Sequence, residues 1–263
     1  MDKTTEIIID SPLVSILMLT YNRANFISEA ILSVLAQTYT NFELIIIDDG
    51  STDNTTDLVS GFIDQRIRYI KHDMNQGLAV RRKESLNYTQ GKYLAVLDSD
   101  DVWADNNKIT EQVTYLETNP NCAVIGTFIN LINERGEKIG QNIYHTTDSD
   151  IRKNILVRNQ FAHSSVMMRK ETIDKTSGYI NLAVAEDFEL FLQLGRIANF
   201  ANIPKFMVNY RVHEGGTSAN KIRIISFVLR VIKIHQNFYP RYLQAYLKFH
   251  LYKSYLTLKY LLG

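Results

Sequence analysis

The sequence predicts an α/β fold, a parallel sheet with helices on both of its faces. Strand-like and helix-like segments alternate four times in the first hundred residues, and the strand-like segments are largely apolar. This alternation implies parallel strands joined by right-handed helical crossovers. Polar clusters follow three of the strands, at 20–23, 48–53 and 98–101. Because ligands bind beyond the carboxyl ends of such strands, we expect the three clusters to converge on one site.

Short local patterns predict the first four strands and their helices. The run LVSILMLT at 13–20 is apolar and β-branched, which favours a buried strand, and apolar residues at helical spacing over about 26–37 favour a helix. The second strand, 42–48, stops at DDGSTDN, a cluster of turn formers and helix caps. The other elements of this half are a helical face of Leu58, Val59, Phe62 and Ile63, a strand at 67–72, a helix from about 77 to 88 and a strand at 93–98.

The pattern changes beyond residue 110. Segments 123–132 and 137–144 flank a turn at 133–136, which predicts a hairpin. A helical face follows Glu186 and Asp187, and the run FMVNYRV at 206–212 alternates like a strand. Residues 221–262 favour two or more helices broken near Pro240. We therefore expect one domain at 1–220 and a helical tail at 221–263.

Composition excludes several classes of protein. Of the 263 residues, 45% are hydrophobic and 22% are charged, which is ordinary for a globular protein. The single cysteine, Cys122, excludes a disulfide framework within the chain and a thiolate zinc site. The N-terminus is too short and too acidic for a signal peptide, and no stretch approaches 18 uninterrupted apolar residues, so we expect a cytoplasmic protein.

The formal net charge of +1 conceals an uneven distribution. Residues 221–263 contain eight basic residues and no acidic residue, which leaves 21 basic against 28 acidic residues in 1–220. The body therefore carries −7 and the tail +8, and six of the 15 tyrosines lie in the tail. Near-neutrality of the whole argues against a nucleic-acid-binding protein.

Three carboxylates crowd the end of the fourth strand, in the run Asp98-Ser99-Asp100-Asp101. Like charges this close are stable only when they are solvated or neutralised by a cation, and carboxylate oxygens suit hard ions such as Mg²⁺ or Mn²⁺. An extended backbone would point Asp98 and Asp100 to one side and Ser99 to the other. The alternative is a solvated turn in which Asp101 caps the next helix.

Four segments in order make the chain resemble the family 2 glycosyltransferases, which have the GT-A fold. They are VSILMLTYNRANFISEAILSVLAQTYTNFELIIIDDGSTDNT at 14–56, NQGLAVRRK at 75–83, GKYLAVLDSDD at 91–101 and AEDFELFLQL at 185–194, with YRVHEGGTS at 210–218 as a weaker fifth. The resemblance spans about residues 13–218. It implies a Rossmann-like mixed sheet flanked by helices, followed here by a C-terminal helical extension.

The resemblance also implies roles for individual residues. Tyr21 is expected to stack on the nucleotide base, Asp49 to bind the base or ribose, and Arg82 to contact the nucleotide. Asp98 and Asp100 form the DxD motif, with Asp100 the direct metal ligand. Asp187 matches the acidic residue of the family's ED motif, the expected catalytic base. The remaining expected positions are Thr20, Asn22, Arg23 and Ser99 for the nucleotide and His213 for the metal or diphosphate.

Some of these assignments stay open at the level of sequence. Relatives usually carry Ala-Arg-Asn where this chain has Arg81-Arg82-Lys83, so any of these three basic residues is a candidate for the pocket. Asp187 would also suit the first turn of a helix for purely electrostatic reasons. His213 fits either the site or an ordinary loop.

These features favour an inverting, metal-dependent glycosyltransferase. A divalent ion, Mn²⁺ or Mg²⁺, would neutralise the diphosphate leaving group of a nucleotide sugar, and a carboxylate would take the proton of the acceptor hydroxyl. By resemblance UDP is the expected nucleotide, with dTDP or GDP as alternatives, and the acceptor is a glycan, a glycolipid or a lipid-linked sugar. The other classes considered are a nucleotidylyltransferase, which the glycine-free turn TYNRAN disfavours, and a non-catalytic carbohydrate-binding protein.

The basic tail predicts a second function. Apolar and basic residues alternate along 221–262, as in segments that dock on anionic membranes, and such docking would bring the enzyme to a lipid-linked acceptor at the inner face of the membrane. The alternatives are that the tail packs on the acidic body or forms a homodimer. Nucleic acid is not an expected partner.

Overall fold

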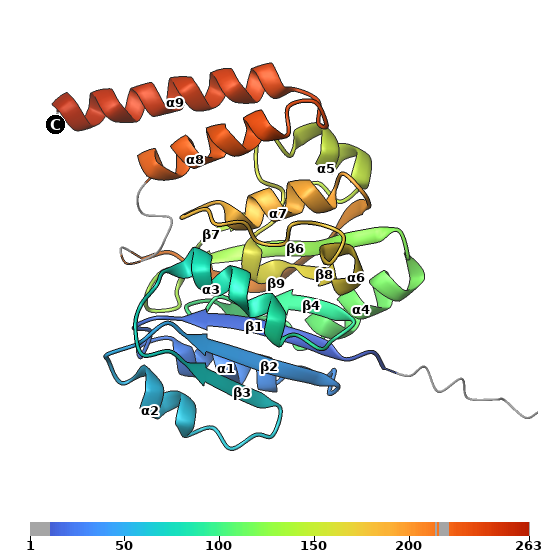
Figure 1. Cartoon of the computed structure of the whole chain (residues 1–263), viewed down its shortest axis with the longest axis vertical. Coiled ribbons are helices and arrows are strands. Elements are labelled where there is room, and N and C mark those ends of the chain that lie inside the picture. The colour runs from blue at the N-terminus through green and yellow to red at the C-terminus, as the bar shows by residue number, and fades with distance from the viewer. Residues whose placement is uncertain (1–10, 214, 216–220, 263) are drawn as a thin grey trace, which may run out of the picture.

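The protein is built on one mixed sheet (Figure 1), seen in a computed structural model that describes residues 11–213, 215 and 221–262. Within these residues nine strands pair in the order β3-β2-β1-β4-β8-β6-β9-β5, and β7 pairs with β6. The strands are β1 Val14–Thr20, β2 Phe42–Asp48, β3 Ile67–Lys71, β4 Tyr93–Val96, β5 Val102–Trp103, β6 Cys122–Ile132, β7 Lys138–Asn142, β8 Met167–Arg169 and β9 Asn199–Arg211.

Helices cover both faces of this sheet. The α-helices are α1 Ile27–Leu35, α2 Thr55–Ser60, α3 Leu78–Ser85, α4 Lys108–Thr118, α5 Asp148–Asn154, α6 Lys170–Ile173, α7 Glu186–Leu194, α8 Lys221–Ile234 and α9 Tyr242–Leu262. Two short 3-10 turns, Leu86–Tyr88 and His163–Ser165, complete the elements. In Figure 1, α7 lies between the sheet and α8, and α9 lies beyond α8.

The predicted parallel pairing of the first four strands is confirmed. β1 runs parallel to both β2 and β4, and β2 runs parallel to β3. The direction changes at β8, which pairs antiparallel with β4 and with β6, so the sheet is mixed. β6 and β9 then run side by side in parallel over nearly their whole length. The carboxyl ends of β1, β2 and β4 therefore meet at one edge, as ligand-binding α/β sheets require.

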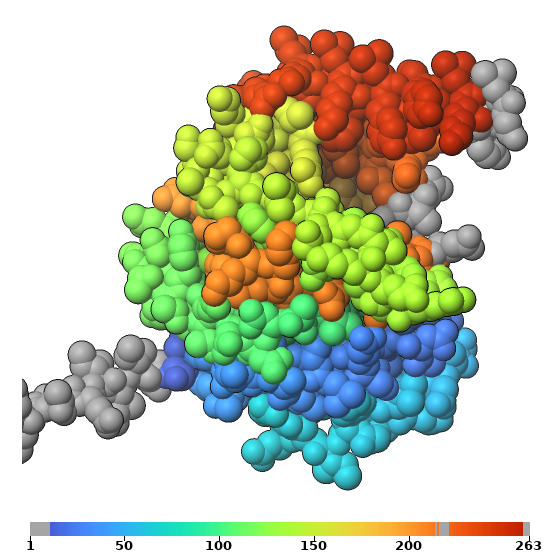
Figure 2. All heavy atoms as spheres, turned by 180° about the vertical axis from the view of Figure 1, so that it is seen from behind, coloured from blue at the N-terminus to red at the C-terminus, as the bar shows by residue number. Residues whose placement is uncertain are grey.

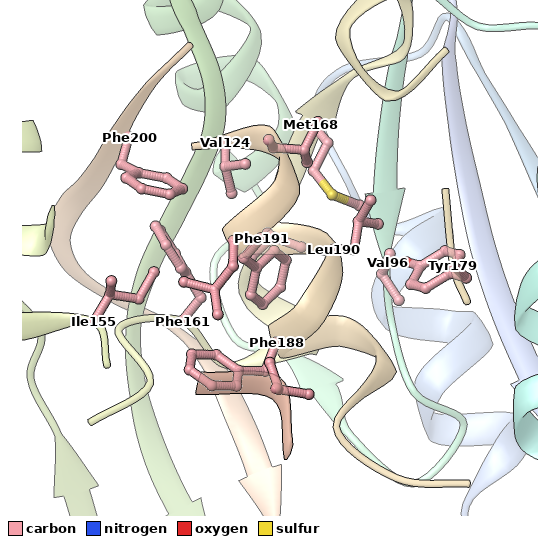
Figure 3. Packing of buried hydrophobic residues seen from close by; sticks show 14 of the residues in the cluster. Val96, Val124, Ile155, Phe161, Met168, Tyr179, Phe188, Leu190, Phe191 and Phe200 are labelled. Carbon is pink, nitrogen blue, oxygen red and sulfur yellow. The ribbon is translucent and has the colours of Figure 1, made fainter. Parts of the chain in front are cut away.

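Alternation along β1 divides the apolar residues between two cores. Ile16 and Met18 face one side, where they join the cluster that contains α1 and α4 residues. Leu17 and Leu19 face the other side and join the cluster beneath α7. Figure 3 shows Phe161 and Phe200 of this second core beside Phe191 of α7, with ring centroids 5.2 Å apart for Phe161 and Phe191. Burial on both faces explains why β1 is apolar almost throughout.

Several element ends differ from the expected ones. α2 ends at Ser60, with Gly61 as its C-cap, so Ile63 lies fully exposed in a loop and takes no part in a helical face. The predicted helix at 77–88 is an α-helix only to Ser85 and continues as a 3-10 turn. β4 ends at Val96, two residues before the DxD motif. The predicted hairpin is confirmed by the antiparallel pairing of β6 and β7, with Gly136 at φ 80° in the turn.

The two helices of the tail pack against the body through α7. Ile225, Leu229 and Ile232 of α8 are buried in the same core as the apolar residues of α7. Between α8 and α9, the Tyr239 hydroxyl donates to the Leu192 carbonyl at 2.8 Å, and His235 Nε2 lies 3.2 Å from Glu189 Oε1. The predicted break at Pro240 is confirmed by the helix bounds. No helix in the described part of the chain is both long enough and apolar enough to cross a membrane.

Candidate active site

A single cavity of about 850 Å³ collects the polar clusters that follow β1, β2 and β4. Its volume is in the range of sites that bind small molecules. The cavity begins at these strand ends and continues to α8 and α9, and Figure 2 shows the recess beneath the red α9 helix. The predicted residues that line it are Thr20, Tyr21, Arg23, Asp49, Arg82, Asp98, Ser99, Asp100, Asp187 and His213.

The loop after β1 is shaped by Asn22, a predicted site residue that does not line the cavity. Its φ of 51° is left-handed, which asparagine tolerates better than most residues. Its side-chain oxygen accepts from the Thr52 backbone N–H at 2.8 Å, and its own N–H donates to Ser51 Oγ at 2.9 Å. Asn22 therefore joins the loops after β1 and β2. This leaves Tyr21 at the rim, 40% exposed, and Thr20 Oγ1 buried without a hydrogen-bond partner.

Asp49 anchors the opposite wall. Its two oxygens accept from the Gly77 N–H at 2.7 Å and from Arg81 Nε at 2.7 Å. The next residue, Gly50, must be a glycine, because φ there is 79° and a Cβ would lie 2.8 Å from the backbone of Met74. Asp49 thus holds the start of α3 in place. This helix carries Arg81, Arg82 and Lys83, the three basic residues that the sequence offers as candidates for the pocket.

Of those three residues, Arg81 and Arg82 line the cavity and Lys83 is exposed. Arg82 is only 1% exposed, and its Nη2 donates to Asp98 Oδ1 at 2.5 Å. Its Nε lies 3.8 Å from Glu186 Oε1, and neither Nε nor Nη1 has a hydrogen-bond partner. Burial alone would raise the pKa of Asp98, but the Arg82 guanidinium holds it below its usual value.

The carboxylates of the DxD turn point to different partners. Asp100 Oδ2 lies 2.9 Å from His213 Nε2 and 3.4 Å from Arg23 Nε, so the structure places His213 beside the DxD turn. Asp101 does not cap a helix. It is buried, accepts from Ser164 Oγ and from the Arg211 N–H, and ties the turn to β9. Burial raises the pKa of Asp101, and Asp100 and Asp98 raise it further. The strand alternation expected for Asp98 and Asp100 does not apply, because β4 has already ended.

Asp187 lies in the first turn of α7, at the cavity. The helix begins after Ala185, which has a left-handed φ of 64° although it is not glycine, a strained conformation of the kind found at functional sites. Burial raises the pKa of Asp187. Burial and the charge of Asp187 raise the pKa of Glu186 to about 7. Near neutral pH, Glu186 therefore holds a proton for part of the time.

The sequence pattern did not single out three further side chains of this network. His163 Nε2 lies 2.9 Å from the Tyr179 hydroxyl, and its Nδ1 lies 4.0 Å from Asp98. Burial and the neighbouring Arg82 lower the pKa of His163 to about 3, so its ring is neutral. Glu186 is the sequence neighbour of Asp187, the predicted base, and that position could have identified it as a site residue. His163 begins a short 3-10 turn and Tyr179 lies in a loop, so no periodicity in the sequence marks either residue.

The residues around Asp100 fit a divalent cation only as a partial ligand set. No three His, Cys, Asp or Glu side chains form a ready metal group in the part of the chain that the structure describes. Asp100 and His213 nevertheless meet at the cavity, with Asp98 held by Arg82. Mg²⁺ and similar ions are usually held by one or two carboxylates together with substrate phosphates. The donor set therefore fits an ion that arrives with a diphosphate.

Comparison with known proteins identifies the family. The model of glycosyl transferase family 2 matches residues 15–176. An uncharacterized glycosyltransferase of Haemophilus influenzae is 33% identical over 222 residues, which are 79% of this chain and 68% of that protein. The Escherichia coli protein WfaP, named a UDP-Glc:alpha-D-GlcNAc-diphosphoundecaprenol beta-1,3-glucosyltransferase, is 33% identical over 223 residues, 84% of this chain and 86% of WfaP.

Solved structures support the same fold at lower sequence identity. The Staphylococcus aureus protein TarS, solved with UDP-GlcNAc, superposes with a TM-score of 0.70 at 17% identity, covering 90% of this chain and 71% of that one. A mannosyltransferase of Pyrobaculum calidifontis, solved with GDP-Man and Mn²⁺, gives 0.68 at 18% identity, covering 92% and 70%. The family match, the curated relatives and the shared fold lead to one conclusion: the chain belongs to glycosyltransferase family 2 and is a glycosyltransferase with the GT-A fold.

Proposed function

We propose that the protein is an inverting, metal-dependent enzyme that transfers a sugar from a UDP-sugar to a hydroxyl of a lipid-linked acceptor in polysaccharide biosynthesis. One observation carries this proposal. Asp100, at the end of β4, and Asp187, at the start of α7, line the same cavity although they are far apart in the chain. A group that can hold a cation and a group that can accept a proton thus face one space.

The donor is assigned to the end of the cavity formed by the loops after β1, β2 and β4. Tyr21 at the rim offers a ring for the base, and stacking of this kind is worth about 1–3 kcal/mol in nucleic-acid complexes. The buried, unpartnered Thr20 Oγ1 offers a hydrogen bond to the nucleotide. Ser99 and Arg23 line the same end. Asp100 and His213 would hold the divalent ion, which when bound neutralises charge on the leaving diphosphate.

Asp187 is the proposed base. The acceptor hydroxyl oxygen attacks the anomeric carbon from the face opposite the diphosphate, and the bond from that carbon to the diphosphate oxygen breaks with its electron pair on the diphosphate. The hydroxyl proton passes to the Asp187 carboxylate. Displacement from the opposite face inverts the anomeric configuration. A positioned base typically contributes 10²–10⁴-fold to the rate.

The relatives support the substrates proposed here. WfaP and a second Escherichia coli protein, WfgD, are both named as enzymes that use UDP-Glc and a GlcNAc-diphosphoundecaprenol acceptor. The Bacillus subtilis relative TuaG, 31% identical, is named a putative teichuronic acid biosynthesis glycosyltransferase. TarS was solved with UDP-GlcNAc, whereas the mannosyltransferase was solved with GDP-Man. UDP is therefore the favoured nucleotide, and GDP is the alternative to be tested.

Peripheral membrane contact through the tail is a further part of the proposal. Four leucines of α9, here called the α9 leucine stripe, remain exposed: Leu243, Leu247, Leu251 and Leu258. The tail contains no acidic residue, and no lysine of α8 or α9 pairs with a carboxylate among the described residues. Exposed leucines beside unpaired lysines suit an anionic lipid surface. Deleting the tail would expose the core that α8 shares with α7. Substitution of the leucines in the α9 leucine stripe is therefore the better test of membrane contact.

The deciding experiment is donor turnover by the purified protein. A panel of UDP-, GDP- and dTDP-sugars with Mn²⁺ is scored by thermal shift and by donor hydrolysis. Asp187→Asn should keep donor binding and lose at least about 10²-fold in transfer, whereas the exposed Asp174→Asn should not change it. Chelation by EDTA should abolish activity, and Mn²⁺ or Mg²⁺ should restore it. Binding without any turnover of any donor would favour a non-catalytic protein, and full activity in EDTA would remove the metal from the mechanism.

A further inference from the structure

The outer end of the cavity, next to α9, contains two cations, Arg158 and Lys248, for which the described residues provide no carboxylate partner. Arg158 follows α5, and Lys248 lies on α9, and both line the cavity. Neither forms an ion pair with a carboxylate among the described residues, in contrast to Arg23, Arg81 and Arg82 at the inner end. The inner end is thus balanced within the protein, and the outer end is positive.

Neutral groups hold both cations in place. Lys248 Nζ donates to the Val157 carbonyl at 2.8 Å, and Arg158 Nη2 donates to Asn142 Oδ1 at 3.3 Å. The Arg158 guanidinium also lies 5.5 Å from the centre of the Tyr144 ring. Burial lowers the pKa of Lys248, and the nearby Arg158 lowers it further. Both cations line the same cavity, so an anion bound there would be attracted to both. Lysine has three donors and arginine five, so both keep donors for a ligand.

Apolar side chains continue the wall beside this cation pair. Ile224 and Val228 of α8 and Phe249 of α9 line the same end of the cavity. All three are only partly buried, so they present apolar surface to the cavity. A hydrophilic anion would gain nothing from such a wall, whereas an anion attached to a hydrocarbon chain would gain free energy by burying the chain there.

We propose that the outer end binds the diphosphate of a prenyl-linked acceptor, with Arg158 and Lys248 on the diphosphate and the first prenyl units along Ile224, Val228 and Phe249. This inference deepens the proposed function and rests on it for one element, the acceptor sugar that points inward to Asp187. The proposed contacts with the diphosphate and the prenyl chain depend only on the five residues just named. The apolar wall of Ile224, Val228 and Phe249 would thereby recognise the lipid carrier of the acceptor.

The test measures binding without any sugar transfer. The full chain is saturated with UDP and Mn²⁺ to fill the donor end, and farnesyl diphosphate is titrated by calorimetry, with farnesol and inorganic pyrophosphate as comparison ligands. We expect farnesyl diphosphate to bind more tightly than either. Arg158→Gln and Lys248→Met should each weaken it by about tenfold or more, because each removes a charge-assisted hydrogen bond. Lys233→Met, an exposed tail lysine outside the cavity, is the matched control and should change nothing.

Two further variants keep the inference falsifiable if a substitution harms folding. Arg158→Lys and Lys248→Arg preserve the charge, so they should bind farnesyl diphosphate more tightly than Arg158→Gln and Lys248→Met, respectively. Equal binding by the wild-type protein, Arg158→Gln and Lys248→Met would overturn the assignment, as would equal affinity for farnesol. Pyrophosphate binding as tight as that of farnesyl diphosphate would overturn the role of the apolar wall. Since donor hydrolysis and the Asp187→Asn result do not depend on these residues, the proposed function and this inference can fail separately.

Discussion

Removal of the buried Arg82 should destabilise the protein in a way that depends on pH. Arg82→Met keeps the apolar stem of the side chain but removes the guanidinium, which lies 2.5 Å from Asp98 and 3.8 Å from Glu186. Removing one partner of a buried ion pair costs about 3–5 kcal/mol. Because the Asp98 side chain is still 31% exposed, we expect the lower end, about 3 kcal/mol at pH 8. For a domain of this size that corresponds to a fall in Tm of roughly 6–12 °C.

The sign of the pH effect follows from the carboxylates left behind. Without Arg82 the pKa of Asp98 and that of Glu186 both rise, since Arg82 lowers each of them in the native protein. Their charged forms then oppose folding at pH 8, and protonation relieves the cost as the pH falls. The stability difference between the wild-type protein and Arg82→Met should therefore shrink by at least half between pH 8 and pH 5.5.

Urea unfolding followed by the fluorescence of the single tryptophan, Trp103, measures both differences. Trp103 is a suitable reporter because it is buried and its indole N–H donates to the Ser164 carbonyl at 2.9 Å. Lys83→Met, one residue along the same helix and exposed, is the control and should change stability by less than about 0.5 kcal/mol. A loss below about 1 kcal/mol in Arg82→Met, or the same loss at both pH values, would refute the argument.

Three further predictions follow from single side chains. Glu186 has a pKa near 7 in the fold against 4.5 in the unfolded chain, so its ionisation makes the free energy of unfolding fall as the pH rises between these values. Glu186→Gln should remove this pH dependence, which amounts to at most about 3 kcal/mol, and thermal shifts measured from pH 4.5 to 8 would show it. Tyr239→Phe loses the bond to the Leu192 carbonyl and should cost about 1 kcal/mol in urea unfolding, and an unchanged midpoint would contradict this docking contact. Burial raises the pKa of Cys122 to about 12, so iodoacetamide should label it only after unfolding, and rapid labelling of the native protein would show that the site opens.

Local patterns were sufficient for much of the fold. Strands buried on both faces leave long apolar runs, so the bounds of β2 at Phe42–Asp48 coincide with the predicted 42–48. β9 shows where such patterns fail. Only 206–212 was expected, but the strand begins at Asn199. Its pairing with β6 jumps from Ile203 to Phe206, which leaves Pro204 at an irregularity where a missing N–H does no harm. A proline within an apolar run argues against a strand from sequence alone. Only the pairing with the partner strand shows that the proline lies where no hydrogen bond is needed.

The site was predictable where a residue is marked by its position at a strand or helix end, as Asp98, Asp100 and Asp187 are. It was not predictable where tertiary contacts decide. Arg81 and Arg82 are neighbours on one helix, and only the placement of Asp49 and Asp98 gives each its partner. The sequence left open whether the tail docks on a membrane, packs on the body or forms a homodimer, and in the structure the apolar face of α8 is buried in the same core as α7. Helical periodicity predicts an apolar face, but it does not identify the surface that the face covers.

The dependence of α7 on the tail has a consequence for biosynthesis. The helix that carries Asp187 in its first turn is fully synthesised at residue 194, but the Leu192 carbonyl finds its partner only when Tyr239 has been made. At about 5–20 residues per second the ribosome needs roughly 2–9 s for the intervening stretch. During that interval the apolar surface of α7 that α8 later covers is open to chaperones and proteases. A nascent chain arrested before α8 would therefore contain every residue of the proposed chemistry and still lack the layer that holds its base in place.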